Sequence, residues 1–354
     1  MDFISLVTRG VDKYGIDPDN LNLTTTDPMI IGMQKKYCEL GKCPFEWAML
    51  DYRPTIAGNS IYIICFFALW IGQAWWGIRN KTWAYFTSMS LGILGEIIGY
   101  IGRVMLNQNP FLMNNFLVNL VPLTIAPAFF TAAIYLCLGR VITAIGFENS
   151  RLKPKLYTII FVSFDVFSLI LQAAGGAMAA TAKTTKGSKN GAKIMVVGLI
   201  SQIVSMVLFF AFWGDFVLRT RRAKMSGSLK RSQPPLYDTL RKGRQFKLFQ
   251  WSLFVATVLI FIRCLYRVAE LWDGFSSHLA NDEATFMIFE GPLIILAVAS
   301  MTVFHPGRIF GNLWVPAGKG VRSLALGKSA STMELTTGHG EHWKSNTNTA
   351  YTHV

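Results

Sequence analysis

The stretch LFQWSLFVATVLIFIRCLYRVAELW, residues Leu248 to Trp272, decides the class of fold. At 1.5 Å per residue, a helix of this length crosses the roughly 30 Å hydrocarbon core of a bilayer. The run nevertheless holds Arg263, Arg267 and Glu270 near its end. Charged side chains in a membrane helix are costly and usually face a bundle interior or a water-filled cavity. The stretch therefore predicts a membrane protein of several packed helices.

Six further runs share this length and composition. The seven predicted spans are approximately Thr55–Gly77, Thr82–Leu106, Phe116–Gly139, Leu156–Ala180, Ile194–Leu218, Leu248–Trp272 and Ala284–Phe304. The 354-residue chain is 52% hydrophobic and 15% charged, with a mean hydropathy of +0.36, which is too apolar for an ordinary soluble domain. No run shows the residue alternation of a membrane barrel. We expect an all-α, polytopic membrane protein with a bundle of seven transmembrane helices.

The basic residues between the spans predict the orientation. The connections after the first, third and fifth spans carry 2, 4 and 10 Lys and Arg residues, and those after the second, fourth and sixth carry 0, 4 and 0. Because basic residues are retained on the cytoplasmic side, the N-terminus is expected outside and the C-terminus in the cytoplasm. The formal net charge of +14 then reflects topology and attraction to anionic lipid, not nucleic-acid binding.

Three regions follow from these spans. Residues 1–53 form an extracellular or lumenal tail with no signal peptide, 54–304 form the membrane domain, and 305–354 form a cytoplasmic tail, rich in Gly, Ser and Thr, that is expected to be disordered. Asn22 begins an Asn-Leu-Thr acceptor for glycosylation, which predicts a glycoprotein if this tail lies outside. Cys38 and Cys43 in the same tail are either two free thiols or a disulfide.

Seven ionisable side chains within the predicted spans are candidates for buried pairing. They are Glu96, Arg103, Asp165, Arg263, Arg267, Glu270 and Glu290. Each costs about 2.5 to 3.5 kcal/mol at mid-membrane, so they need partners. Glu96 and Arg103 lie on one stripe of the second span, at i and i+7, and the three charges of the sixth span lie at i, i+4 and i+7. The four acids and three bases nearly cancel, as buried pairing across a bundle requires.

The depth of these side chains predicts a shared site. With the orientation above, all except Asp165 fall in the outer half of the membrane, where Gln172 and Gln202 join them, and Asp165 lies deeper. We expect these nine residues to line a polar substrate cavity that opens outward or toward the outer leaflet. The competing interpretation is a set of structural ion pairs that fix helix register and bind nothing.

Small residues and prolines indicate how the helices pack. The second span contains Gly92, Gly95, Gly99 and Gly102, and the fourth contains Gly175 and Gly176. Such residues let helix backbones approach closely. Pro122, Pro127 and Pro292 remove helical hydrogen bonds and free backbone carbonyls within the membrane. A gating role for these positions remains open beside the packing role.

Six segments carry a resemblance that runs through all seven spans. They are YRPTIAGN (Tyr52–Asn59), EIIGYIGR (Glu96–Arg103), APAFFTAAIY (Ala126–Tyr135), FDVFSLILQAAGG (Phe164–Gly176), GLISQ (Gly198–Gln202) and IRCLYRVAE (Ile262–Glu270). In these segments the sequence resembles the fungal lipid-translocating exporter family, an RTA-like group that includes the sphingoid long-chain base transporter and the 7-aminocholesterol-resistance protein. Met287 stands where Tyr is frequent in that family, and Glu290 where Asp is frequent.

The resemblance implies seven helices, a plasma-membrane or endomembrane setting, and export or transbilayer movement of amphipathic lipids, sterol-like toxins or porphyrins. The function expected is therefore a transporter or export factor whose partners are membrane lipids and an amphipathic small-molecule substrate. Gly327-Lys328-Ser329 lacks the partner glycine of a phosphate-binding loop, because Arg322 stands there. Energy would then come from a gradient, a protein partner or downhill flow, with Asp165 the candidate for proton coupling. The sequence predicts no particular protein partner.

Two other classes of function compete with transport. A lipid-sensing receptor would have the same seven helices, although the third span lacks an acid-Arg-aromatic switch and the seventh lacks an Asn-Pro-x-x-Tyr element. A membrane enzyme is disfavoured because all five histidines lie in predicted loops or tails and no nucleophile-base pair is evident. The sequence therefore predicts no catalytic residue, no metal ligand and no cofactor.

Overall fold

The computed structural model describes residues 34–146, 150–151, 153–182, 184–227, 235–272 and 281–319, and a few isolated positions before and between them. The long helices are α3 (Ile56–Arg79), α4 (Trp83–Gln108), α5 (Met113–Ile145), α6 (Pro154–Thr181), α7 (Thr185–Met225), α10 (Arg244–Leu271) and the consecutive pair α11 (Glu283–Phe289) and α12 (Gly291–Val303). The short ones are η1 (Lys35–Tyr37), η2 (Phe45–Trp47), η4 (Pro235–Tyr237), α9 (Asp238–Lys242), α13 (Pro306–Phe310), η5 (Gly311–Leu313) and α14 (Trp314–Lys319).

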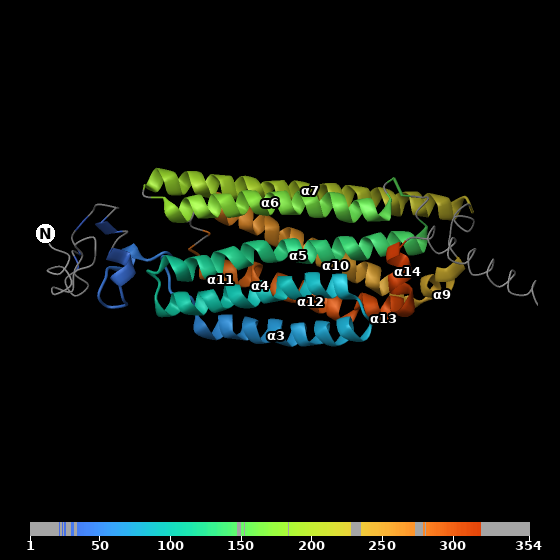
Figure 1. The fold of residues 1–354 in the computed structure, drawn as a ribbon, viewed down its shortest axis with the longest axis horizontal. Helices are drawn as coiled ribbons and strands as arrows, with labels where there is room; N and C mark the ends of the chain where they lie inside the picture. Colours follow the sequence, from blue (N-terminus) through green and yellow to red (C-terminus); the bar gives the residue numbers. More distant parts are fainter. Residues whose placement is uncertain are drawn as a thin grey trace, which may run out of the picture.

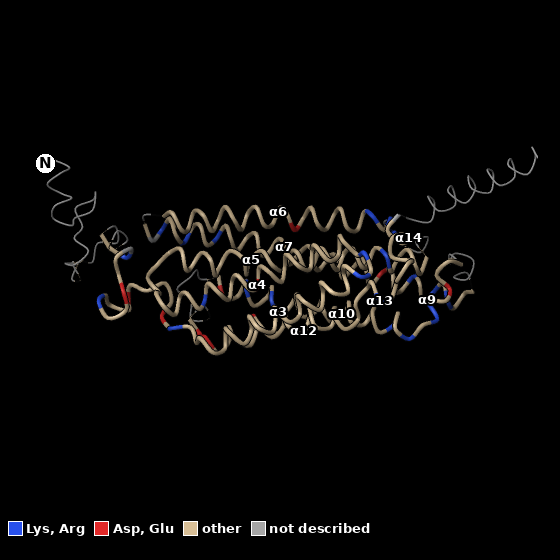
Figure 2. The backbone as a smooth tube through the Cα atoms, turned by 60° about the horizontal axis from the view of Figure 1, so that its bottom comes forward, with Lys and Arg blue, Asp and Glu red and all other residues tan. Residues whose placement is uncertain are grey.

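The long helices run side by side along one axis (Figure 1). They provide seven segments long and apolar enough to cross a membrane, and the described residues form no strand. The predicted all-α, seven-helix fold of a multi-pass membrane protein is thus confirmed. Figure 2 shows the charged residues concentrated at the two ends of the bundle, with a few acidic and basic positions inside it.

The N-terminal segment lies at one end of the bundle, and α9, α13 and α14 lie at the other (Figure 1). An odd number of spans requires this separation. We call the two ends the N-terminal end and the opposite end. Which of them faces the cytoplasm remains the prediction made from the basic residues.

The α4–α5 and α6–α7 contacts depend on small residues, as the sequence predicted. A Cβ on Gly99 would lie 2.5 Å from Leu123 Cγ, and one on Gly102 would collide with the Asn119 backbone of α5. A Cβ on Gly175 would similarly lie 2.5 Å from the backbone nitrogen of Met195 in α7. Of the seven spans, α5 is the most buried and α3 the least.

Helix α7 begins nine residues before the fifth predicted span. The Thr184 hydroxyl caps it by accepting a hydrogen bond of 3.1 Å from Gly187 N. Its 41 residues extend about 60 Å, roughly twice the hydrocarbon thickness. Lys186, Lys189 and Lys193, which the sequence placed in a connection, are therefore on a helical extension at the N-terminal end.

The ordered chain also continues past the predicted domain boundary at residue 304. Residues 306–319 form α13, η5 and α14, although the sequence placed them in a disordered tail. Phe310 and Trp314 are buried in the core, and the Arg140 guanidinium of α5 lies 3.5 Å from the centre of the Trp314 ring. The polar composition of the tail as a whole concealed these apolar anchors. Residues 320–354 lie outside the described part of the chain.

Candidate functional site

Arg263 of α10 binds two carboxylates from two other parts of the bundle. Its Nη1 lies 2.6 Å from Glu96 Oε1 of α4, and its Nη2 lies 2.7 Å from Glu290 Oε1, at the junction of α11 and α12. All three side chains are fully buried, so water does not screen the ion pairs. Because an unpaired buried charge is costly, these residues fix one another's position across three helices.

A further contact to Arg263 comes from the backbone of α5. Nη2 also donates to the Leu123 carbonyl oxygen at 3.0 Å. In a regular helix this carbonyl accepts from the N–H four residues later, but that residue is Pro127, which has none. Pro127 thus frees an acceptor inside the membrane, and the Arg263 guanidinium uses it.

The seventh span is interrupted at Glu290, between α11 and α12. At the break, the Tyr62 hydroxyl of α3 donates a hydrogen bond of 2.6 Å to the Met287 carbonyl. The Tyr62 ring lies against Gly291, the first residue of α12, where a Cβ would approach the ring to 2.6 Å, and Pro292 lies in the first turn of α12. The break is therefore stabilised from α3. Interrupted membrane helices of this kind line binding sites in secondary transporters.

Arg267 lies one turn further along α10 than Arg263. Its Nη1 lies 2.6 Å from Glu270 Oε2 of the same helix, and its Nε lies 3.6 Å from Glu290 Oε1. Its Nη2 donates to the Thr124 hydroxyl of α5 at 3.2 Å. The charged stripe of the sixth span thus points into the bundle, and Glu290 connects its two arginines.

Arg103 of α4 lies on the side of these ion pairs nearest the N-terminal end. Its guanidinium lies 3.8 Å from the centre of the Phe286 ring of α11, and its Nη2 donates to the Tyr52 hydroxyl at 2.8 Å. Burial raises the pKa of Tyr52, against the opposing effect of Arg103, so the phenol stays neutral at physiological pH. The Arg103 charge also acts on Glu270 and Glu290, although no ion pair forms with either.

We call six of these side chains the charge cluster: Glu96, Arg103, Arg263, Arg267, Glu270 and Glu290. Each is at most 6% exposed, and the three acids balance the three bases. Within the described residues, five of its polar atoms have no hydrogen-bond partner: Oε2 of Glu96, Oε2 of Glu290, and Nε of Arg103, Arg263 and Arg267. The sequence predicted a cavity that opens outward; in this conformation the same residues pack against one another.

The segment before α3, residues 35–55, covers the charge cluster at the N-terminal end, and we call it the capping segment. Asn107 Nδ2 of α4 donates to the Pro54 carbonyl of this segment at 2.7 Å. Glu283 Oε1 of α11 accepts from the backbone nitrogen of Thr55 at 2.6 Å. The segment is thus attached to α4 and to α11, and Tyr52 reaches Arg103 from between these attachments.

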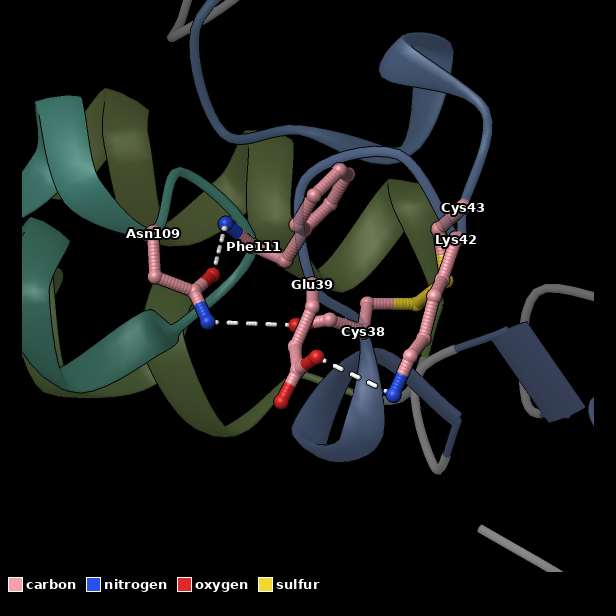
Figure 3. The surroundings of a disulfide bond; sticks show 6 residues. All are labelled: Cys38, Glu39, Lys42, Cys43, Asn109 and Phe111. Atoms are coloured by element: carbon pink, nitrogen blue, oxygen red, sulfur yellow. Dashed lines mark hydrogen bonds and ion pairs between the residues drawn. A yellow bond between two sulfur atoms is a disulfide. The ribbon is translucent and has the colours of Figure 1, made fainter. Parts of the chain in front are cut away.

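A disulfide joins Cys38 and Cys43 of the capping segment, with their Cα atoms 5.6 Å apart (Figure 3). Asn109 Nδ2 donates to the Cys38 carbonyl at 3.1 Å, and Phe111 packs in the same apolar cluster as Cys38. These contacts attach the disulfide loop to the α4–α5 connection. The glycosylation predicted at Asn22 lies outside the described residues and remains a prediction.

Asp165 of α6 lies in a separate polar environment between α5, α6 and α7. It is 2% exposed, and its Oδ2 lies 2.7 Å from the Thr131 hydroxyl of α5. The hydroxyls of Tyr135 and Ser205 also lie close to the carboxyl group. No Lys or Arg forms an ion pair with Asp165 in the part of the chain that the structure describes.

Gln172 and Gln202 bind each other instead of the charge cluster. Gln172 Nε2 donates to Gln202 Oε1 at 3.2 Å, between α6 and α7. One turn away, Ser168 donates to Ser201 at 3.1 Å. Gly198 permits this close pairing because a Cβ there would meet the Gln172 side chain at 2.7 Å. The amides thus hold the α6–α7 pair together.

Four groups at the charge cluster were missed by sequence reasoning: the Leu123 carbonyl, the Thr124 hydroxyl, Tyr52 and Phe286. For two of them, the spacing in the sequence could have predicted the contact. Leu123 precedes Pro127 by four residues, and Phe286 precedes Glu290 by four, which places it on the same helical face. Nothing in the sequence pointed to Tyr52, which lies before the first span. No group of three His, Cys, Asp or Glu residues is placed to hold a metal ion within the described ranges.

A family model described as "RTA1 like protein" matches residues 89–313, which include every member of the charge cluster. No solved structure is significantly similar to this chain.

Three curated relatives from Saccharomyces cerevisiae are similar to this chain. The sphingoid long-chain base transporter RSB1 is 34% identical over 255 residues, which cover 66% of this chain and 66% of that protein. Protein RTM1 is 30% identical over 66% of this chain and 71% of its own length. Protoporphyrin uptake protein 1 is 29% identical over 63% of this chain and 68% of its own length. The match to the first relative thus spans just under two thirds of its length.

Proposed function

Because the chain belongs to the family of RTA1-like proteins, we propose that it is a membrane transporter or export factor for amphipathic lipids or lipid-like compounds of the sphingoid-base, sterol-like or porphyrin class. Two of its relatives are named for the transport or uptake of such molecules, a sphingoid long-chain base and a protoporphyrin. Both molecules combine a large apolar part with charged groups. A protein that handles them needs a polar site within reach of the lipid.

The charge cluster is the head-group site in this proposal. The carrying observation is that a buried, charge-balanced set of three acids and three bases retains five polar atoms without hydrogen-bond partners in the described chain. Buried polar groups in a purely structural network are normally all hydrogen-bonded, so unpartnered ones call for a functional explanation.

The unpartnered atoms suit both kinds of head group. A protonated amine can donate to the Oε2 atoms of Glu96 and Glu290, whereas a carboxylate can accept from the Nε atoms of Arg103 and Arg263. Because the empty cluster is neutral, its ion pairs can rearrange around either head without leaving a naked buried charge. The apolar part of the substrate would stay in lipid, so little of it needs to be desolvated.

The orientation and location are part of the proposal. We place the N-terminal end outside and the C-terminal end in the cytoplasm, in the plasma membrane or alternatively an endomembrane. The basic residues of the connections support this orientation, and the disulfide of the capping segment suits an oxidising compartment. The head-group site would then open toward the outer side.

Flux through the purified protein in liposomes tests the proposal. Labelled sphingoid bases, sterols and porphyrins are offered separately, and we expect one class to cross faster than in protein-free vesicles. Arg267→Gln should still accumulate at the membrane and, per protein present, lose roughly tenfold or more in affinity for the charged amphiphile. Arg151→Gln, which removes an exposed ion pair with Asp215 at the opposite end, is the matched control and should leave flux unchanged.

Two results would overturn the assignment. If Arg267→Gln loses membrane abundance and flux in strict proportion, the charge cluster is structural. If wild-type protein moves no class of amphiphile but recruits a cytoplasmic protein when ligand is added, the chain is a lipid-sensing receptor.

A further inference from the structure

Asp165 is surrounded by hydroxyl groups and aromatic rings. Thr131 and Tyr135 approach it from α5, and Ser205 approaches from α7. The Tyr135 ring packs against Phe161 and Phe209, with ring centres 5.4 and 4.6 Å away. The carboxyl group is therefore held in an apolar environment that offers hydroxyls but, among the described residues, no ion-paired Lys or Arg.

The two short contacts of the Thr131 hydroxyl are compatible with a protonated Asp165. Its Oγ1 lies 3.0 Å from the Ala128 carbonyl oxygen and 2.7 Å from Asp165 Oδ2. A hydroxyl has one hydrogen, and a carbonyl oxygen can only accept. If Thr131 donates to Ala128, the shorter contact is a hydrogen bond only when Asp165 carries a proton on Oδ2 and donates it to Thr131. Both contacts are then satisfied.

The surrounding groups can also accommodate the ionised form. The Tyr135 and Ser205 hydroxyls have no hydrogen-bond partner in the described residues, and neither does Asp165 Oδ1. If the proton leaves, Thr131 can turn its hydrogen from Ala128 to the carboxylate, and the other two hydroxyls can donate to it as well. The site thus has a hydrogen-bonding arrangement for each protonation state.

Among the described residues, the titratable side chains near Asp165 are two neutral groups, the Tyr135 phenol of α5 and the Cys264 thiol of α10, and α7 contributes the Ser205 hydroxyl. Cys264 follows Arg263 in α10 and also senses the charges of Arg263 and Glu290. Helix α10 thus places Cys264, the neighbour of the central arginine of the charge cluster, on the side of Asp165.

We propose that Asp165 is a proton-binding site, occupied in this closed conformation, and that its release and uptake of a proton is coupled to substrate movement. The first part rests on the burial of Asp165, on the lack of an ion-paired Lys or Arg among the described residues, and on hydroxyl contacts that suit the protonated acid. The coupling rests on the proposed transport function, and the proton would pass to or from water when α5, α6 and α7 separate enough to hydrate the carboxyl group.

Infrared difference spectroscopy tests the proton directly. We compare the full chain in lipid at neutral pH with its Asp165→Asn variant. The wild-type minus variant spectrum should show the positive band of a protonated carboxylic acid, because the variant has lost that group. Asp215→Asn is the matched control, because Asp215 is ion-paired to Arg151 and Arg219 and should lose a carboxylate band instead. In Thr131→Val, the acid band should shift because its hydrogen-bond acceptor is gone. Loss of a carboxylate band from Asp165→Asn would overturn the proposal.

Flux measured against pH in liposomes tests the coupling. Wild-type flux should respond to a pH gradient across the membrane, and Asp165→Asn should lose that response while still reaching the membrane. An unchanged response in Asp165→Asn would overturn the coupling, even with the acid band present. If no amphiphile moves in wild-type protein, transport itself fails, and the infrared result still decides whether Asp165 holds a proton.

Discussion

The Leu123 carbonyl oxygen lies 3.0 Å from Nη2 of Arg263. Pro127 has no N–H to bind this carbonyl within α5, so the central arginine of the charge cluster takes the place of the missing donor. Arg263 lies on α10. Within the described residues, it is the only cluster member with hydrogen bonds to α4, α5 and the α11–α12 junction. Its position therefore depends on the backbone of α5 as well as on two carboxylates.

Pro127→Ala should weaken this link. The new N–H can bind the Leu123 carbonyl within the helix and compete with Arg263, which would lose part of a charge-assisted hydrogen bond worth about 1.5 to 3 kcal/mol. We expect normal membrane abundance and reduced amphiphile flux, measured on the same vesicles. Pro122→Ala is the control. It restores the helical hydrogen bond to the Val118 carbonyl, which Arg263 does not bind in the described chain. Equal loss in both variants would show that proline-dependent helix shape matters and not this contact.

Arg263 and Glu96 should show strong energetic coupling. Arg263→Gln leaves two buried carboxylates short of a partner, which costs about 3 to 5 kcal/mol, so we expect little protein in the membrane. Adding Glu96→Gln should recover part of that loss, because Glu290 still has Arg267 at 3.6 Å. The coupling is measured from the thermal stability in detergent and the membrane abundance of wild type, Arg263→Gln, Glu96→Gln and the double variant. Additive effects would contradict the ion pair.

The helices and the membership of the charge cluster could be predicted from sequence, each for a physical reason. Run length against bilayer thickness identified the seven spans, and the cost of buried charge required Glu96, Arg263 and Glu290 to meet. Helical periodicity also placed Gly99 and Gly102 on one packing face. These inferences use local patterns and a single strong energy term, so they need no tertiary information.

The closure of the site could not be predicted in the same way. Tyr52 and Phe286 enclose Arg103 from segments far apart in sequence, and neither carries a charge that demands a partner. Gln172 and Gln202 had a similar limitation: their polarity predicts that they avoid lipid, but it does not say which neighbouring helix they bind. The packing of α6 on α7 at Gly198 decides that they bind each other.

The break in the seventh span gives a prediction about α3. Gly291→Ala would place a Cβ 2.6 Å from the Tyr62 ring, so α3 must move or the break must straighten. We expect a larger loss of stability than from Tyr62→Phe, which removes one hydrogen bond worth about 0.5 to 1.5 kcal/mol. Melting temperatures of the two variants in the same detergent provide the comparison. Gly311→Ala is not a suitable control because of its positive φ, whereas Gly214→Ala meets open space and should be neutral.

The orientation can be tested on intact cells. If the N-terminal end lies outside, Asn22 is glycosylated, and the basic loop from Arg219 to Lys247 resists protease added from outside. The reason is the excess of basic residues at the connections of the opposite end, 16 against 4. The measurement is a shift in mobility after glycosidase treatment, together with the fragments that trypsin releases before and after permeabilisation. Cleavage of the loop in intact cells would reverse the orientation.

The capping segment gives the last prediction, since it covers the charge cluster through Tyr52. In the chain-entropy view, a disulfide that closes so short a loop as Cys38–Cys43 contributes about 2 kcal/mol to the order of the segment. The double variant Cys38→Ser, Cys43→Ser should therefore keep the seven-helix bundle intact but let trypsin cut at Lys42 faster than in wild type. Asn109→Ala, which removes the hydrogen bond to the Cys38 carbonyl, should act in the same direction but more weakly. If the segment is also the barrier above the cluster, both variants should change amphiphile flux in the same order as their cleavage rates, with Arg151→Gln unchanged in both. Faster cleavage with unaltered flux would show that ligands reach the charge cluster by another route, such as laterally from the lipid.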